Sequence, residues 1–374
     1  MNAGDLPAAM TPGSSTVVRI GRAPFLLLGM LSLLAGLWGG IARLGWPLGP
    51  VPAGAITYHG PLMLAGFLGT VIGLERAVVA KSPWTYAAPL FTGSGSLLHL
   101  APGGADAGGT LVALGSLVMT AALARSAWNL PVHWTAAQLL GALCFAAGSV
   151  LFATGEPFAH VLPWWQAFLV LTIAGERLEL SRLLQPSGTA LRLFAGLVAL
   201  LVAGAVAQSL DGTGLGPRLS GASWLGLALW LGRWDLARKS LSRPGLPRYV
   251  AAAVLAGHAW LGVAGLLALG FGGVAAGPGY DAVLHALLLG FVFSMIFGHA
   301  PLIFPSVLGL PIAFRARFWL HLSLLHAGVL LRVASDLVAW TGGRTSGGLL
   351  SAAAILLFLF QTAGSLTGPA EDTG

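Results

Sequence analysis

The sequence predicts an all-α, polytopic membrane protein with about twelve transmembrane helices. Of its 374 residues, 56% are apolar and only 8% are charged, whereas about 25% of a typical soluble domain is charged. The mean hydropathy is +0.84, and 54 glycines are spread along the apolar runs. Such a chain cannot cover a water-facing surface. These observations exclude a soluble domain and favour one continuous bundle of helices.

Glycines, prolines and charge clusters divide the chain into about twelve apolar segments, each near the roughly 20 residues that a bilayer requires. In order, we expect helices at residues 22–43, 55–79, 84–101, 107–127, 132–154, 158–184, 190–210, 219–241, 247–272, 280–305, 316–341 and 346–367. They form one bundle domain over residues 19–367, between short tails at 1–18 and 368–374.

The positive charges support this division. With the N-terminus in the cytoplasm, fifteen Lys and Arg fall on the inner side, and only Arg43, Arg218 and Arg344 on the outer side. Positive residues concentrate in cytoplasmic loops, so we expect both tails in the cytoplasm. No transit-like presequence or secretory signal is recognisable, which favours a bacterial inner membrane. The net charge of +7 is dispersed over loops, so nucleic acid is not an expected partner.

Three segments share a plan that suggests an internal repeat. His59 precedes Glu75 by 16 residues, and His160 precedes Glu176 by the same number, about 24 Å of helix. The segment at 280–305 has His285 and, fourteen residues later, His299. Because these are segments two, six and ten, they suggest three four-helix units in a pseudo-threefold arrangement.

The histidines are the strongest candidates for chemistry. The single cysteine, Cys144, excludes an internal disulfide, a Cys-based zinc site and an iron–sulfur cluster. His59 and His285 each lie about one turn inside the outer end of a helix. Two neutral imidazoles at one depth can be the axial ligands of a b-type haem. The alternative is that each one caps a helix end at the interface.

Other polar side chains within the helices are also candidate sites. Glu75-Arg76 and Glu176-Arg177 are interpreted as a proton pathway, an anion site or structural ion pairs at the inner boundary. Arg332 is spaced for an ion pair with Asp336, or it pairs with a haem propionate.

A second group of histidines lies near the inner side. His299, His321 and His326 come from two consecutive segments. His321 and His326 are five residues apart and do not share a helix face. A second metal with His299 and His321 among its ligands is the weaker expectation. His258 is interpreted as structural.

Two segments resemble a known family. Tyr58-His59-Gly60-Pro61-Leu62-Met63-Leu64-Ala65-Gly66-Phe67 is similar to the Trp-His-Ala-His-x-Met-x-x-Gly-Phe motif of the NnrS family of haem and copper membrane proteins linked to nitric oxide metabolism. His285-Ala286-Leu287-Leu288-Leu289-Gly290, followed by Met295 and Gly298-His299, resembles that family's His-Ala-x-x-x-Gly helix. The resemblance implies haem, with copper a second possibility, and a small gas or redox ligand.

The sequence also departs from this pattern. Pro61 stands where the family has its second histidine, and Met295 is closer to Gly298-His299 than in the family. The layout is similar to the main subunit of haem-copper oxidases, which has haem ligands on helices two and ten. Its copper site needs helices six and seven, and the segment at 190–210 has no histidine. A full haem-copper oxygen reductase is therefore not expected.

The leading hypothesis is a membrane protein that binds haem b through His59 and His285 and handles nitric oxide or redox stress. One alternative is a proton-coupled secondary transporter, with helices broken at Pro61, Pro301 and Pro305. Another is a scaffold or assembly factor. The number of copies that assemble is left open, as is whether the chain is an enzyme.

Overall fold

The computed structural model describes residues 21–47, 49–210, 214–309 and 312–365. All regular structure in this part of the chain is helical. The tails expected at 1–18 and 368–374 lie outside the described residues. The fold class predicted from the sequence, a helical multi-span membrane protein, is confirmed.

Helix occupies each of the twelve expected segments. The first six hold α2 (Ala23–Arg43), then α3 (Ala53–Thr57), α4 (His59–Pro61), η1 (Leu62–Gly69) and α5 (Thr70–Ala80), then η2 (Pro83–Tyr86) and α6 (Ala87–Leu98), then α7 (Ala105–Asn129), α8 (His133–Ala153), and α9 (Phe158–Ser181) with η3 (Arg182–Leu184). The last six hold α10 (Gly188–Leu210), α11 (Leu215–Trp234) with α12 (Ala237–Ser240), α13 (Leu246–Phe271), then α14 (Pro278–His285), η4 (Ala286–Phe293) and α15 (Ser294–Leu308), then α16 (Phe318–Leu337) and α17 (Thr341–Ser365).

Ten of these helical segments are long and apolar enough to cross a membrane, counted within the described ranges. Two expected spans fail this test. The segment at 84–101 forms a helix of only 12 residues, α6. The segment at 219–241 forms α11, which carries Arg218 and Arg233 and ends at Trp234. By length and apolar composition, ten spans are therefore candidates within the described residues, against the about twelve helices expected.

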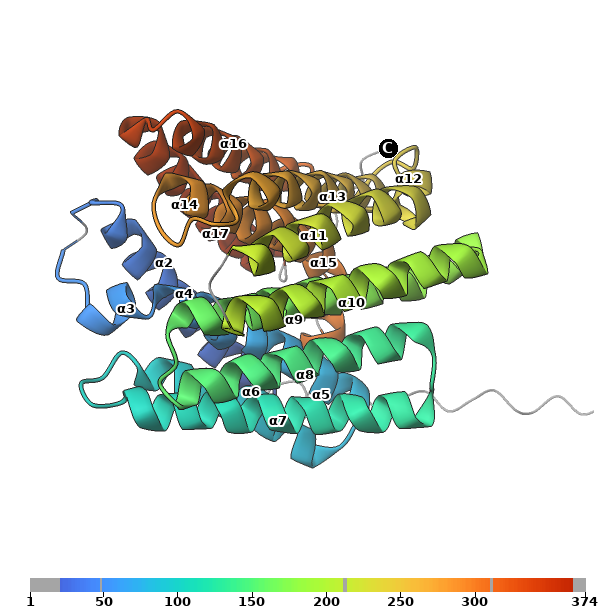
Figure 1. The fold of residues 1–374 in the computed structure, drawn as a ribbon, viewed down its shortest axis with the longest axis horizontal. Helices are drawn as coiled ribbons and strands as arrows, with labels where there is room; N and C mark the ends of the chain where they lie inside the picture. The colour runs from blue at the N-terminus through green and yellow to red at the C-terminus, as the bar shows by residue number, and fades with distance from the viewer. Residues whose placement is uncertain (1–20, 48, 211–213, 310–311, 366–374) are drawn as a thin grey trace, which may run out of the picture.

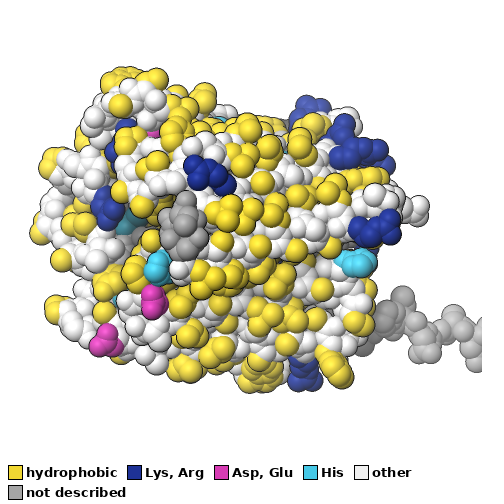
Figure 2. All heavy atoms as spheres, viewed as in Figure 1, with side chains coloured by type: hydrophobic (Ala, Val, Ile, Leu, Met, Phe, Trp, Pro, Cys, Tyr) yellow, Lys and Arg dark blue, Asp and Glu magenta, His cyan; other side chains and the backbone are white. Residues whose placement is uncertain are grey.

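The helices run roughly side by side along the long axis of the molecule (Figure 1). Neighbours in sequence pack against each other, as α7 does on α8 and α16 on α17. The last described helix returns to the first: the Trp46 indole, beyond α2, donates to the Thr345 carbonyl of α17 at 3.3 Å. Hydrophobic side chains cover much of the face in Figure 2, and Lys and Arg gather chiefly at the end where α12 lies.

The segments that share the histidine plan are the inner helices of the bundle. Among the ten candidate spans, the share of buried residues in the apolar window is highest in Phe158–Leu184, at 72%. It is 61% in both His59–Ala80 and Pro278–Pro305. The others range from 33% to 50%. The inner position fits the expected repeat of segments two, six and ten. The pseudo-threefold arrangement itself stays a prediction.

Two of the inner segments contain a π-helical stretch, which the sequence analysis did not anticipate. In η1 the residues Leu62–Gly69, and in η4 the residues Ala286–Phe293, take the wider π turn. Each stretch comes shortly after a predicted ligand histidine, His59 or His285. Each also carries a Gly-Phe pair at the same position, Gly66-Phe67 and Gly290-Phe291. π turns inside α-helices are rare and often lie at functional sites.

Candidate functional site

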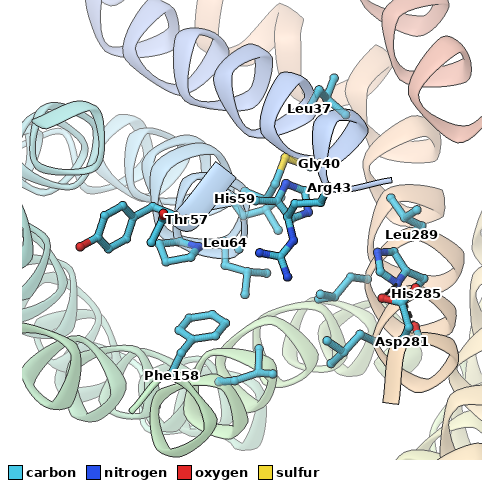
Figure 3. A pocket seen from close by; sticks show the side chains of 18 of the residues that line it. Leu37, Gly40, Arg43, Thr57, His59, Leu64, Phe158, Asp281, His285 and Leu289 are labelled. Carbon is cyan, nitrogen blue, oxygen red and sulfur yellow. Dashed lines mark hydrogen bonds and ion pairs between the residues drawn. The ribbon is translucent and has the colours of Figure 1, made fainter. Parts of the chain in front are cut away.

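The principal cavity lies at the end of the bundle where α4 and α14 meet, which we call the cavity end. Its volume is about 690 Å³, within the range of roughly 300–1,000 Å³ typical of ligand sites. His59 from α4 and His285 from the end of α14 are both on its wall, and Arg43 extends between their helices in the view of Figure 3. The structure thus brings the two predicted histidines to one cavity.

Helix α2 fixes the orientation of His59. The His59 Nδ1 lies 2.6 Å from the Gly36 carbonyl oxygen; since a carbonyl only accepts, Nδ1 carries the proton. Gly40, one turn further along α2, leaves the space for the ring: a Cβ there would be 2.6 Å from the His59 Cε1. With Nδ1 protonated, the lone pair of the neutral ring is on Nε2.

His285 has the same tautomer but a charged neighbour. Its Nδ1 lies 2.8 Å from the Asp281 carbonyl oxygen and 3.3 Å from the Asp281 Oδ1. The Asp281 Oδ2 in turn lies 2.8 Å from Arg332 and 3.2 Å from Arg344. In ligand histidines, a hydrogen bond from the second ring nitrogen to a carbonyl or carboxylate fixes the ring and raises its basicity.

Arg332 therefore pairs with α14 and not with its own helix. The expected i,i+4 partner, Asp336, lies instead 3.3 Å from the Arg344 Nε. Asp281 and Arg344 complete an ionic network that the local spacing on α16 could not reveal. Arg332 does line the cavity, as expected of a group that could meet a propionate.

The cavity wall combines apolar side chains with basic ones. Apolar side chains from several elements line it, including Leu37, Leu64, Leu68, Phe158, Leu288, Leu289, Phe293 and Ile355. Arg43, Arg332 and Arg344 add three guanidinium groups to this lining. A flat apolar molecule that carries acidic groups at one edge would match this distribution.

Histidine His160, on the third inner helix, does not reach this cavity. It lies on a smaller pocket of about 130 Å³, and its Nδ1 is 3.3 Å from the Glu156 Oε2 in an exposed i,i+4 pair. The plan shared by segments two, six and ten therefore leads to one cavity only for the histidines of segments two and ten.

The two Glu-Arg pairs meet each other. The guanidinium of Arg76 donates to the carboxylate of Glu176 across α5 and α9, and Glu75 Oε1 lies 4.0 Å from the same guanidinium. Arg177 points elsewhere: its NH1 is 3.9 Å from the Asp235 Oδ2. The interpretation as ion pairs fits Arg76 and Glu176.

The three histidines of the second group each have hydrogen-bond partners of their own. Both nitrogens of His321 are in hydrogen-bond contact, Nε2 with the Tyr249 hydroxyl at 2.8 Å and Nδ1 with the Gln361 Oε1 at 2.7 Å. His326 accepts from the Trp260 indole at 3.0 Å, and His299 Nδ1 is 2.6 Å from the Met295 carbonyl. No group of three His, Cys, Asp or Glu within the described ranges is placed to hold a metal ion. These contacts argue against one metal site for His299 and His321.

Sequence reasoning missed four polar residues of these sites. Asp281 was missed although it stands i,i+4 to the predicted His285, a spacing that is visible in the sequence. Arg43 and Arg344 were counted only as outer loop charges. His258, interpreted as structural, lies 3.6 Å from the buried Asp235, which follows α11 and is remote in sequence.

A family model for a domain of unknown function, DUF8744, matches residues 22–367. The chain belongs to this family. No protein with a curated description matches the DUF8744 chain. The resemblance to the NnrS family therefore stays a prediction.

Among solved structures, the DUF8744 chain is similar to a chain in a cryo-EM structure of a heme-copper terminal oxidase dimer. The two are 13% identical, the match covers 96% of this chain and 85% of the other, and the TM-score is 0.52. At this identity the likeness shows a shared fold. The expected similarity to haem-copper oxidases is thus confirmed for the fold.

Proposed function

We propose that this membrane protein binds one haem b in the cavity, with His59 and His285 as its axial ligands. The observation that carries the proposal is the pair of half-buried imidazoles on one cavity wall, each held through Nδ1 by a main-chain carbonyl. In both rings the nitrogen able to ligate iron is then Nε2, which has no hydrogen-bond partner among the described residues.

The lining fits this group. The macrocycle of a haem is flat and apolar, and the leucine and phenylalanine side chains of the wall would bury it. Its propionates are anionic, and the lining includes the Arg43, Arg332 and Arg344 guanidinium groups; guanidinium groups bind carboxylates well. A bound haem supplies one-electron transfer and, where an axial position opens, binding of a small gas.

The physiological role is the further part of the proposal. Handling of nitric oxide or redox stress follows from the resemblance to the NnrS family, as does copper. The bacterial inner membrane with both termini in the cytoplasm follows from the charge distribution. No observation favours the transporter hypothesis: the charged groups of the cavity pair with one another, and the fold match is to an oxidase chain.

The test is the visible spectrum and haem content of protein purified in mild detergent from haem-replete cells. We expect about one haem b per chain and a low-spin spectrum that sharpens on reduction with dithionite. His59→Ala and His285→Ala should each abolish haem retention. The control is His160→Ala, whose side chain is exposed and lies on the other pocket.

A folded, colourless wild-type protein would contradict the proposal. Retention of haem in both cavity variants would show that other side chains are the ligands.

A further inference from the structure

A second polar site lies inside the bundle, toward the α12 end. Asp235 follows the last residue of α11 directly, and α12 begins two residues later. His258 comes from α13 and Arg177 from α9. The exposed fractions of the three residues are 1%, 4% and 7%. Nothing in the proposed haem site uses them.

These groups are close together but not hydrogen-bonded to each other. The Asp235 Oδ2 is 3.6 Å from the His258 Nε2 and 3.9 Å from the Arg177 NH1, beyond the usual limit of about 3.2 Å for such bonds. Among the described residues, the Asp235 Oδ2 and both nitrogens of His258 have no hydrogen-bond partner. Each unmet buried group costs about 1–3 kcal/mol. The site therefore has the capacity for one more small species.

The charges around the site select that species. Among the described residues, the ionisable groups within 4.0 Å of the Asp235 carboxylate are Arg177 and His258, so one fixed cation already faces one anion. An anion would be repelled by Asp235. A metal ion would be repelled by Arg177, and the described residues offer no set of three ligands for one. A proton needs no additional room.

We propose that Asp235 and His258 form a buried site that binds one exchangeable proton. In the loaded state the proton is on the Asp235 carboxyl, and the unprotonated His258 Nε2 faces it; on release the imidazole accepts the proton and passes it to water. Heavy-atom bonds do not change, and no electron moves. Asp235 lies outside the candidate spans, and burial raises its pKa above the ordinary value, against the opposing effect of Arg177.

Other elements bring few charges to the pair. From α9 come Arg177 and Glu176, and from α15 comes His299, whose Nε2 is also unpaired. Arg238 and Lys239 of α12 are exposed. The histidines of α16 are occupied by Tyr249 and Trp260.

Infrared spectroscopy of the purified full chain tests the proposal without reference to haem. Wild-type protein at neutral pH should show a carboxylic-acid C=O band that shifts in D₂O. Asp235→Asn should lose that band. The matched control is Glu156→Gln, which removes the acid of an exposed acid–histidine pair and should keep it. Identical bands in wild type and Asp235→Asn would overturn the proposal.

A second variant serves if Asp235→Asn does not fold. In His258→Leu the protonated carboxyl loses the imidazole nitrogen that faces it, so the midpoint at which the band titrates should fall by at least about one pH unit, a tenfold change in proton affinity. An unchanged midpoint would equally overturn the proposal. Because haem content is measured separately, failure here leaves the cavity assignment intact, and the reverse also holds.

Discussion

At the scale of single residues, the space beside His59 depends on a glycine. A Cβ at Gly40 would overlap the His59 ring, so Gly40→Ala should turn the ring away from the cavity while α2 keeps its helix. Because the supports of a ligand histidine are typically worth 10- to 100-fold in affinity, we expect about tenfold weaker haem binding, measured by haem titration. Gly196→Ala, in α10 with open space around it, is the control and should bind haem normally.

Asp235 predicts a dependence of stability on pH. Burial raises its pKa in the folded state, so the protonated form is the one that folding favours. Its stabilising contribution is complete below the unfolded value, near 3.9, and is lost as pH rises through the folded value. Thermal unfolding in detergent should therefore show wild type losing stability with rising pH relative to Asp235→Asn. Parallel pH profiles for the two proteins would contradict this.

Residue partners across helices were the least predictable part of the site. The spacing of Arg332 and Asp336 allowed a local ion pair, but Asp281 takes Arg332 because α14 packs on α16. Similarly, His258 was isolated in its own helix, and only tertiary packing brings Asp235 to it. Spacing reveals neighbours within a helix; it carries no information on which helices adjoin. His59 and His285 were predictable because depth along a helix follows directly from residue count.

At the scale of helices, a proline shapes one buried network. Pro301 has no N–H, so the Phe297 carbonyl of α15 has no helical partner. The Tyr249 hydroxyl of α13 lies 3.3 Å from that carbonyl and 2.8 Å from the His321 Nε2. Gln361 extends the network to α17. Four helices are thereby tied together at one point.

Removal of the Tyr249 hydroxyl should loosen this point. Tyr249→Phe leaves the Phe297 carbonyl and the His321 Nε2 unpaired, which should cost about 1–3 kcal/mol, seen as a lower Tm in detergent. Tyr86→Phe, in the short helix η2 near the surface, is the control and should change Tm little. Equal Tm values for wild type and Tyr249→Phe would mean that water replaces the hydroxyl.

Helix positions followed from apolar length, but local helix type did not. Each expected segment contains helix because a bilayer-length apolar run has few other options. The π stretches η1 and η4 escaped prediction, since hydropathy does not register a change of one residue per turn. The length of α6 was also missed, because its apolar run continues past the residue where the helix ends.

At the scale of the whole molecule, the orientation in the membrane can be tested with thiols. The single cysteine, Cys144, is buried, so Cys144→Ser gives a silent background. In that background we expect Glu156→Cys, at the cavity end, to react with a membrane-impermeant thiol reagent added to intact spheroplasts. Lys239→Cys, in α12, should react only after the membrane is opened. The reverse pattern would place both termini outside.

The two polar sites of this bundle lie toward opposite ends: the cavity is lined by α4 and α14, and Asp235 lies in the short link between α11 and α12. Each of the two sites is therefore near only one end of the bundle. With the bundle axis across a membrane, solutes on one side would reach the arginines of the cavity, while the acidity of the other side would set the occupancy of the Asp235–His258 pair. A single chain of this shape can respond to two separate solutions at the same time.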